Sequence, residues 1–171
     1  MIFINRQSEY SASSELFRLL SVINLFKNDS PEARLTIHKR WSFFKPKYDI
    51  GFRDGKKLEF RALSFWKMHY QCQCGPDIYN IYGHRGRKHS VYKNDTQVAW
   101  WDKEVVSWFD GDNYTIMADG DSNTELIIAF CLIMDNHKSD RHDGNAVSID
   151  IGNIGGQVKK FDPDFLQKVP G

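Results

Sequence analysis

Short stretches in which apolar and polar residues alternate recur along the middle of the chain, and each ends at a polar turn. The clearest pair covers residues 48–52 and 58–62, with Asp54-Gly55 between them. An Asp-Gly turn between two alternating stretches is among the strongest signals for a β-hairpin, because the tight turn needs a positive φ. The period of two begins near residue 34 and predicts a chain built mainly from short antiparallel strands.

More predicted strands follow at close spacing. They cover residues 65–74, 78–82, 89–92, 97–101, 105–109 and 114–118, with a last short alternation at 147–151. In the longest of them, one face carries Trp66, Met68, Tyr70, Cys72 and Cys74. Strands repeated so often, with polar turns between them, are typical of an antiparallel meander that packs as a sandwich or closes into a barrel.

Two segments show a helical signal instead. Within residues 13–27, apolar residues have the spacing i, i+3, i+4, i+7 of one helical face. They are Leu16, Leu19, Leu20, Ile23 and Phe26. Pro31 cannot continue a helix, so the pattern predicts a helix that ends before it. The valine, isoleucine and phenylalanine residues of the same segment also suit a strand.

The second helical signal lies near the C-terminus. Ser122-Asn-Thr-Glu125 has the pattern of a capping box, in which hydroxyl and carboxylate satisfy each other's backbone amides. Residues 126–134 follow it and are apolar on every side. A helix without a polar face must be surrounded by protein, so we expect a buried helix over residues 124–135.

These elements predict a single α+β domain. Its fold class is an antiparallel β-barrel, or a strongly curved meander, wrapped around a buried hydrophobic helix near the C-terminus. We expect the β-rich core over residues 34–151, with the helix at 124–135. A polar loop is expected to follow Asp135 through Gly144, and residues 152–171 form a loosely attached tail.

A late, all-apolar helix after a many-stranded meander resembles the tubby C-terminal-like fold, in particular its bacterial members related to plant LURP-one proteins. The similar stretch runs from Tyr48 to Asn136 and includes Tyr48-Asp-Ile-Gly-Phe-Arg-Asp-Gly-Lys, Ile81-Tyr-Gly-His-Arg-Gly-Arg-Lys, Val91-Tyr-Lys-Asn-Asp-Thr-Gln-Val-Ala and Leu126-Ile-Ile-Ala-Phe-Cys-Leu-Ile-Met-Asp. The resemblance implies a barrel around a central helix and a mostly non-enzymatic family, whose eukaryotic tubby members bind phosphoinositide head groups at the plasma membrane. No phosphoinositide-binding residue of tubby matches a position in this chain.

Charge is balanced in total but unevenly distributed. Lys plus Arg (23) nearly equals Asp plus Glu (22), and this argues against a protein dedicated to nucleic acid. Residues 34–67 are rich in bases, including Lys56 and Lys57, whereas residues 102–125 are rich in acids. A basic face can hold anionic lipid head groups. Alternatively, the two regions lie side by side and pair on an ordinary solvated surface.

The densest basic cluster is residues 84–89. A glycine-containing turn with Arg85, Arg87 and Lys88 can bind a phosphate, because guanidinium donates two parallel hydrogen bonds and glycine lets backbone amides approach. The alternative is a hairpin tip with solubilising charges. The candidate ligand-binding residues are therefore Arg85, Arg87, Lys88, Lys56 and Lys57.

Two short segments contain residue types that can bind metal ions, and both also fit a purely structural role. Cys72-Gln-Cys74 lacks the C-x-x-C spacing of zinc and redox sites, and its thiols fit a strand's core face. A zinc site can be drawn from His137, His142, Asp140 and Asp143, but a polar loop after the helix has the same composition. We expect both groups to be structural and expect no cofactor.

No sequence motif for nucleophilic catalysis, a P-loop or a dinucleotide fingerprint is present. The prediction is a non-catalytic binding module for anionic phospholipid head groups. A small-molecule carrier with a lipocalin-like barrel, or an enzyme of unrecognised type, are the alternatives. With no evident signal peptide or membrane span, we expect a cytoplasmic protein that associates peripherally with membranes.

Overall fold

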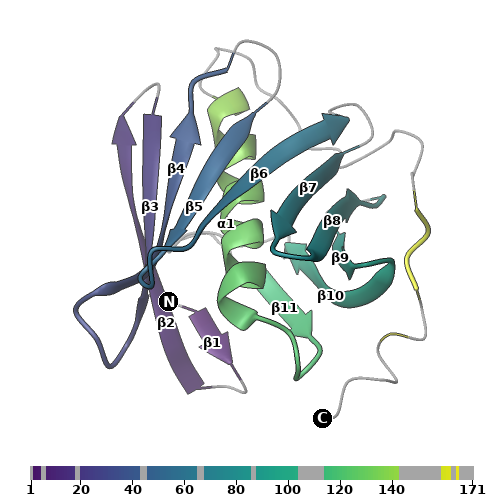
Figure 1. Ribbon diagram of the computed structural model, residues 1–171, viewed down its shortest axis with the longest axis horizontal. Coiled ribbons are helices and arrows are strands. Elements are labelled where there is room, and N and C mark those ends of the chain that lie inside the picture. Colours follow the sequence, from purple (N-terminus) through teal and green to yellow (C-terminus); the bar gives the residue numbers. More distant parts are fainter. Residues whose placement is uncertain are drawn as a thin grey trace. The chain divides into compact units, whose positions relative to one another are not determined.

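The structure is a computed structural model. It describes residues 2–4, 7–17, 20–42, 46–64, 68–85, 88–103, 114–142, 159–162 and 165. These residues contain eleven strands and one helix (Figure 1). The chain divides into two units, Met1–Arg61 (unit 1) and Ala62–Gly171 (unit 2). The observed antiparallel strands and single helix confirm the α+β class, whereas closure into a barrel stays a prediction.

Unit 1 is a meander in which each strand pairs antiparallel with the next one along the chain. Its strands are β1 (Ile2–Ile4), β2 (Gln7–Phe17), β3 (Leu20–Lys27), β4 (Ala33–Arg40), β5 (Lys47–Phe52) and β6 (Lys57–Ser64), of which β6 continues into unit 2. Alternate residues of a strand point to opposite faces. One face is therefore apolar and buried, with Ile23, Leu25, Leu35, Ile37, Tyr48, Ile50, Leu58 and Phe60.

The turn between β5 and β6 is the predicted Asp-Gly hairpin. Gly55 has a φ of +86°, a conformation that a side chain disfavours. The amide of Lys56 donates to Asp54 Oδ1 at 2.9 Å, and the amide of Phe52 donates to the carbonyl of Lys56 at 2.8 Å. The predicted hairpin is therefore confirmed, and these hydrogen bonds close its turn.

The predicted helix over residues 13–27 is wrong. This segment contains the last five residues of β2 and all of β3, and Phe17 and Leu20 are cross-strand partners. The helical spacing of its apolar residues spans two strands, so no single element carries it. Strands also begin well before residue 34, where the β-rich core was expected to start.

Unit 2 continues with a second run of antiparallel neighbours. Its strands are β7 (His69–Cys74), β8 (Asp77–Gly83), β9 (His89–Lys93), β10 (Thr96–Lys103) and β11 (Tyr114–Ala118). They confirm the strands predicted at 78–82, 89–92, 97–101 and 114–118. The strands predicted at 105–109 and 147–151 lie outside the described residues.

The long strand predicted over residues 65–74 is shorter than expected. It begins only at His69, because Met68 precedes it in a turn with a φ of +45°. Met68 also explains a glycine: a Cβ on Gly83 would lie 2.7 Å from the Cβ of Met68, too close for any side chain. The expected core placement of Trp66 concerns a residue outside the described part of the chain.

The single helix, α1 (Thr124–His142), begins one residue later than a capping box at Ser122 requires. Its N-cap is Asn123, whose Oδ1 accepts from the amide of Leu126 at 3.0 Å. Ser122 instead directs its hydroxyl to the carbonyl of Val98, at 3.4 Å. The predicted helix start is correct, but the capping residue was misassigned.

Helix α1 is buried along its apolar run, as predicted. Leu126 through Met134 are buried except Leu132, which is partly exposed. Phe130 packs on Tyr79 of β8, with ring centroids 5.8 Å apart. The predicted polar loop after Asp135 is wrong, because the helix continues to His142 through polar residues that include neither proline nor glycine. Within the described residues, no helix is both long and apolar enough to cross a membrane.

Candidate functional site

Three cations form a row across unit 1, on the face opposite its buried core. Arg40 of β4 is the register partner of Lys47 of β5, and Lys47 is the partner of Arg61 of β6. Directly opposed residues place their Cβ atoms about 5 Å apart, so the three side chains are neighbours. We call Arg40, Lys47 and Arg61 the basic row.

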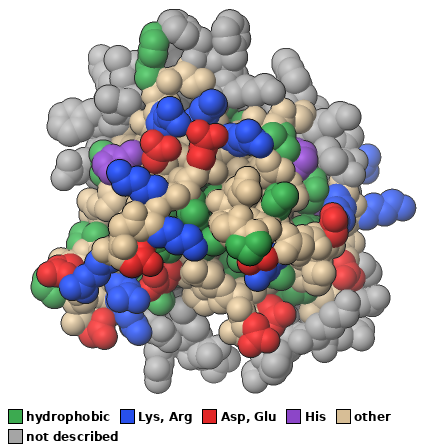
Figure 2. Space-filling model, in the orientation of Figure 1, with side chains coloured by type: hydrophobic (Ala, Val, Ile, Leu, Met, Phe, Trp, Pro, Cys, Tyr) green, Lys and Arg blue, Asp and Glu red, His purple; other side chains and the backbone are tan. Residues whose placement is uncertain are grey.

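The next row on the same face is acidic at two of its three positions, which are His38, Asp49 and Glu59. Arg40 reaches both carboxylates: its Nη1 lies 2.9 Å from Glu59 Oε2 and 3.6 Å from Asp49 Oδ1. Figure 2 shows basic side chains beside acidic ones on the face turned to the viewer. The two carboxylates thus balance part of the positive charge of this face.

A large aromatic residue directly follows the basic row. Trp41 comes next after Arg40, the last residue of β4, and it is 63% exposed. Exposed tryptophans beside cations are characteristic of surfaces that meet the interface of a membrane, where the indole has both apolar and polar surroundings. The sequence analysis missed Trp41, although the run Lys39-Arg40-Trp41 at a strand end was visible.

Two of the predicted ligand-binding residues lie close to this surface. Lys57 is exposed on the same face of β6 as Arg61, four residues earlier. Lys56 is exposed in the hairpin turn just before it. The structure therefore places both lysines in unit 1 with the basic row, and Lys57 adds a further positive charge to its face.

The other predicted residues belong to the connection between β8 and β9 in unit 2. Arg85 and Lys88 are exposed there, and Arg87 lies outside the described residues. The ammonium of Lys88 lies 3.9 Å from Asp102 Oδ2 and 5.7 Å from the centre of the Trp100 ring. The charge of Lys88 thus faces a carboxylate and an indole of β10.

The two histidines that flank this connection are buried. His84 Nε2 lies 2.6 Å from Ser90 Oγ, and His89 stacks on Trp101 with ring centroids 5.1 Å apart. Burial lowers the pKa of His84, because a charged imidazole loses its hydration there. Neither histidine is exposed at the hairpin tip, so the exposed basic cluster is smaller than its sequence indicates.

The outer face of β8–β10 carries a second grouping, which is aromatic. Tyr82 and Tyr92 meet edge to face, with ring centroids 5.5 Å apart and an angle of 79° between the rings. Burial raises the pKa of both phenols, so both remain neutral at physiological pH. We call Tyr82 and Tyr92 the tyrosine pair.

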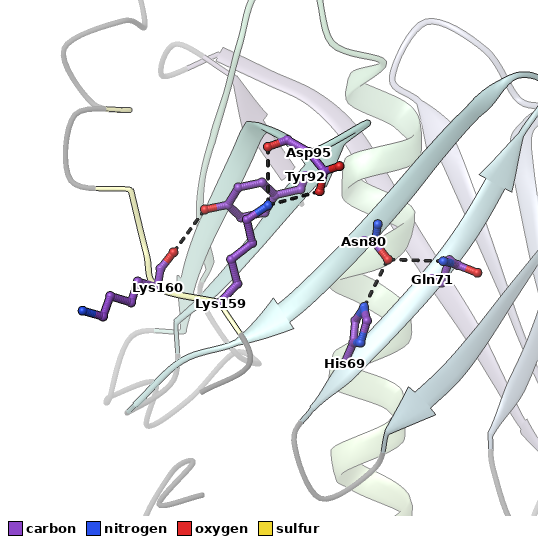
Figure 3. A network of polar contacts seen from close by, with 7 residues as sticks. All are labelled: His69, Gln71, Asn80, Tyr92, Asp95, Lys159 and Lys160. Carbon is purple, nitrogen blue, oxygen red and sulfur yellow. Dashed lines mark hydrogen bonds and ion pairs between the residues drawn. The ribbon is translucent and has the colours of Figure 1, made fainter. Parts of the chain in front are cut away.

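The neighbouring end of this face is lined by amides and an imidazole (Figure 3). Asn80 Oδ1 lies 3.1 Å from His69 Nε2 and accepts from Gln71 Nε2 at 3.3 Å. His69 also stacks on Tyr82, with ring centroids 4.5 Å apart. Each of these polar groups is thus held by a neighbour on an adjacent strand.

Residues 159–162, which we call the strap, lie against the tyrosine pair. Lys159 places its ammonium 3.9 Å from the centre of the Tyr92 ring and 6.0 Å from that of Tyr82. Its Nζ is also 3.4 Å from Asp95 Oδ1 and from the Asp95 carbonyl. Tyr92 Oη donates to the carbonyl of Lys160 at 3.2 Å (Figure 3). This part of the predicted loose tail is therefore attached to unit 2.

The two cysteines that were considered as metal ligands lie on a strand and are at least partly buried. Cys72 is buried and Cys74 partly buried on β7. Across the part of the chain that the structure describes, no group of three potential metal ligands occurs. Asp143 and the side chains of His137, Asp140 and His142 lie outside that part, so the structure does not test the zinc alternative.

Comparisons with known proteins add no family assignment. No protein-family model, no curated protein and no solved structure matches the chain. The resemblance to the tubby C-terminal-like fold therefore stays an expectation from the sequence, and function has to be argued from the two surfaces of the molecule itself.

Proposed function

We propose that the protein is a non-catalytic module that binds anionic phospholipid surfaces through the basic row and Trp41. One observation carries this proposal: three cations occupy adjacent cross-strand positions, and the exposed indole of Trp41 directly follows one of them, Arg40, in the sequence. Like charges in directly opposed positions repel each other across a sheet, and the contacts of Arg40 with Glu59 and Asp49 offset part of that repulsion, so binding of a further anion at the row is favourable.

Charge and geometry favour a surface rather than a small enclosed anion. The outer face of β4–β6 carries five cations, Arg34, Arg40, Lys47, Lys57 and Arg61, against Asp49 and Glu59, a formal excess of three positive charges (five minus two). Each base near an anionic membrane contributes about 1 kcal/mol of attraction. Because sheet side chains stand away from the strands, several can contact separate head groups at once while Trp41 enters the interface.

The proposed surface lies outside the core, as the expected architecture requires. We propose that the strands curve around α1, and in such a barrel the buried side chains of the helix occupy the interior. An apolar ligand then has no space inside, which disfavours the carrier alternative.

Co-sedimentation with vesicles tests the proposal. The protein is expected to bind vesicles that contain phosphatidylserine and not to bind vesicles of phosphatidylcholine alone. Binding to the anionic vesicles should be weaker at physiological salt than at low salt. Inorganic phosphate, compared with chloride at equal ionic strength, separates a lipid surface from a free-phosphate site. Selective release by phosphate indicates the latter, and equal binding to neutral vesicles overturns the proposal.

A further inference from the structure

The geometry points to a second binding site, on the outer face of β8–β10, for a peptide that carries a lysine followed two residues later by an aromatic residue. In the structure this site is occupied in cis by the strap (residues 159–162). The occupant that this inference commits to is a segment of another protein chain with the same chemistry as the strap. This inference is independent of the lipid surface proposed for unit 1, since it uses residues of unit 2 alone.

The first step is the recognition of an ammonium group. Two neutral tyrosine rings at 79° present a face and an edge to the same side, and the nitrogen of Lys159 lies over the face of Tyr92. Aromatic rings arranged around a cation are the usual means by which proteins bind lysine and quaternary ammonium groups. The side chain of Lys159 remains 31% exposed, so the ammonium is reached from solvent.

The second step is the recognition of the peptide around that lysine. Tyr92 Oη donates to the carbonyl of Lys160, and Gln97 Oε1 accepts from the amide of Asp162 at 3.1 Å. Between these contacts, the ring of Phe161 meets two rings of the face edge-on. They belong to His84 and Trp100, each with a centroid 5.7 Å away. The face thus binds main chain as well as side chains.

The third step concerns hydrogen bonds: the strap leaves some buried polar groups of this face without a partner among the described residues. Among the described residues, the buried N–H groups Gln97 Nε2 and Trp100 Nε1 have no acceptor, and His84 Nδ1 also has no hydrogen-bond partner. The residues His84 and Gln97 are only 4% and 6% exposed. Buried polar groups normally have partners, and all three of these residues contact the strap directly. A ligand with a carbonyl or carboxylate at this point satisfies groups that the strap does not.

A peptide from another chain has to compete with the strap. A tethered segment acts at an effective concentration of about 1 mM, so the intact chain binds such a peptide weakly. Weakening the strap without altering the face removes this competition. Phe161→Ala does so at the aromatic contact, and Lys159→Ala does so at the tyrosine pair; both residues belong to the strap and leave the strands unchanged.

The probe is a fluorescein-labelled peptide of residues 156–164, measured by anisotropy with the full-length chain. We expect the Phe161→Ala chain to bind it at least about tenfold more tightly than the wild-type chain. Lys160→Ala is the matched control, because the side chain of Lys160 is exposed and only its carbonyl is bound. That variant should bind the peptide as the wild type does. Circular dichroism establishes that each variant is folded, and Lys159→Ala serves as the second variant.

Modified peptides test the chemistry of the site. Trimethylation of the lysine equivalent to Lys159 keeps the charge and should preserve binding, whereas acetylation removes it and should abolish binding. Equal affinity of the wild-type and both strap variants for the peptide would overturn the inference. So would equal binding of acetylated and unmodified peptides. Binding of soluble phosphocholine without any peptide binding would assign the tyrosine pair to a lipid head group instead.

Discussion

Lys47 and Arg61 lie directly opposite each other on β5 and β6, so two like charges share one cross-strand position. On its other side, Lys47 is opposed by Arg40, another cation. These like-charge pairs repel each other and favour binding of an anion, although the contacts of Arg40 with Glu59 and Asp49 offset part of the repulsion. The basic row therefore predicts opposite effects of one substitution on stability and on binding.

Lys47→Glu is expected to stabilise the fold while it weakens binding to anionic vesicles. A glutamate between Arg40 and Arg61 replaces two repulsive cross-strand pairs with attractive ones, a gain of about 0.5–1 kcal/mol in the free energy of unfolding. Urea unfolding followed by circular dichroism measures the change. A lower unfolding midpoint for the variant would show that the row does not oppose folding.

The pH dependence of stability should report His84. Burial lowers the pKa of His84 in the folded chain below the value of about 6.5 expected after unfolding. Between those two values the unfolded chain binds more protons, so the free energy of unfolding decreases as the pH falls below about 6.5. The contribution is at most about 1.4 kcal/mol per pH unit, and above 6.5 it is constant.

Unfolding of the wild type and of His84→Gln between pH 7.5 and 5 isolates this contribution. The variant cannot titrate there, so its free energy of unfolding should decrease less steeply than that of the wild type. Parallel curves for the two proteins would contradict the assignment.

Two positions on α1 should respond differently to a buried charge. Ile128 is 2% exposed, whereas Leu132 is partly exposed on the same helix. Ile128→Asp should therefore cost more than about 3 kcal/mol through desolvation of the carboxylate, enough to unfold a marginally stable protein. Leu132→Asp should cost clearly less, as measured by thermal unfolding. Equal losses at both positions would contradict the burial of the helix as described.

The start of α1 gives a fourth prediction. Asn123→Ala removes the acceptor for the amide of Leu126 and should cost about 1 kcal/mol, whereas Asn123→Asp should retain the cap. Ser122→Ala should cost less than Asn123→Ala, because Ser122 makes only a long contact outside the helix. Chemical denaturation of the three variants checks the order, and a larger loss for Ser122→Ala would restore the predicted capping box.

Much of the fold was predictable because local signals and the fold agree. Asp54-Gly55 encodes a turn that needs a positive φ, and residues 126–134 lack any polar face. Residues 13–27 misled because their helical spacing arises from two strands, and pairing with β4 rather than local propensity decides their conformation. Helix α1 extends beyond its apolar residues 126–134. Once the first turns are buried, the residues that continue the helix need not be apolar.

The candidate surfaces were only partly predictable. The exposed lysines at 56 and 57 were found, but the basic row depends on the register of three strands, which the sequence does not state. The contact of Tyr92 with Lys160 joins residues 68 positions apart in the sequence, and no local sequence pattern predicts such a contact. Cross-strand neighbours and docked segments are set by tertiary structure alone.

The most direct test of the proposed function compares two matched double variants in co-sedimentation with phosphatidylserine vesicles. Lys47→Gln with Arg61→Gln neutralises the basic row, and Arg85→Gln with Lys88→Gln neutralises the hairpin tip of unit 2. Each pair removes one lysine and one arginine, so the total charge changes equally. The account predicts that the first pair loses vesicle binding while the second retains it. Full binding by the first pair, with loss confined to the second, would contradict the account and place the lipid site at the hairpin tip.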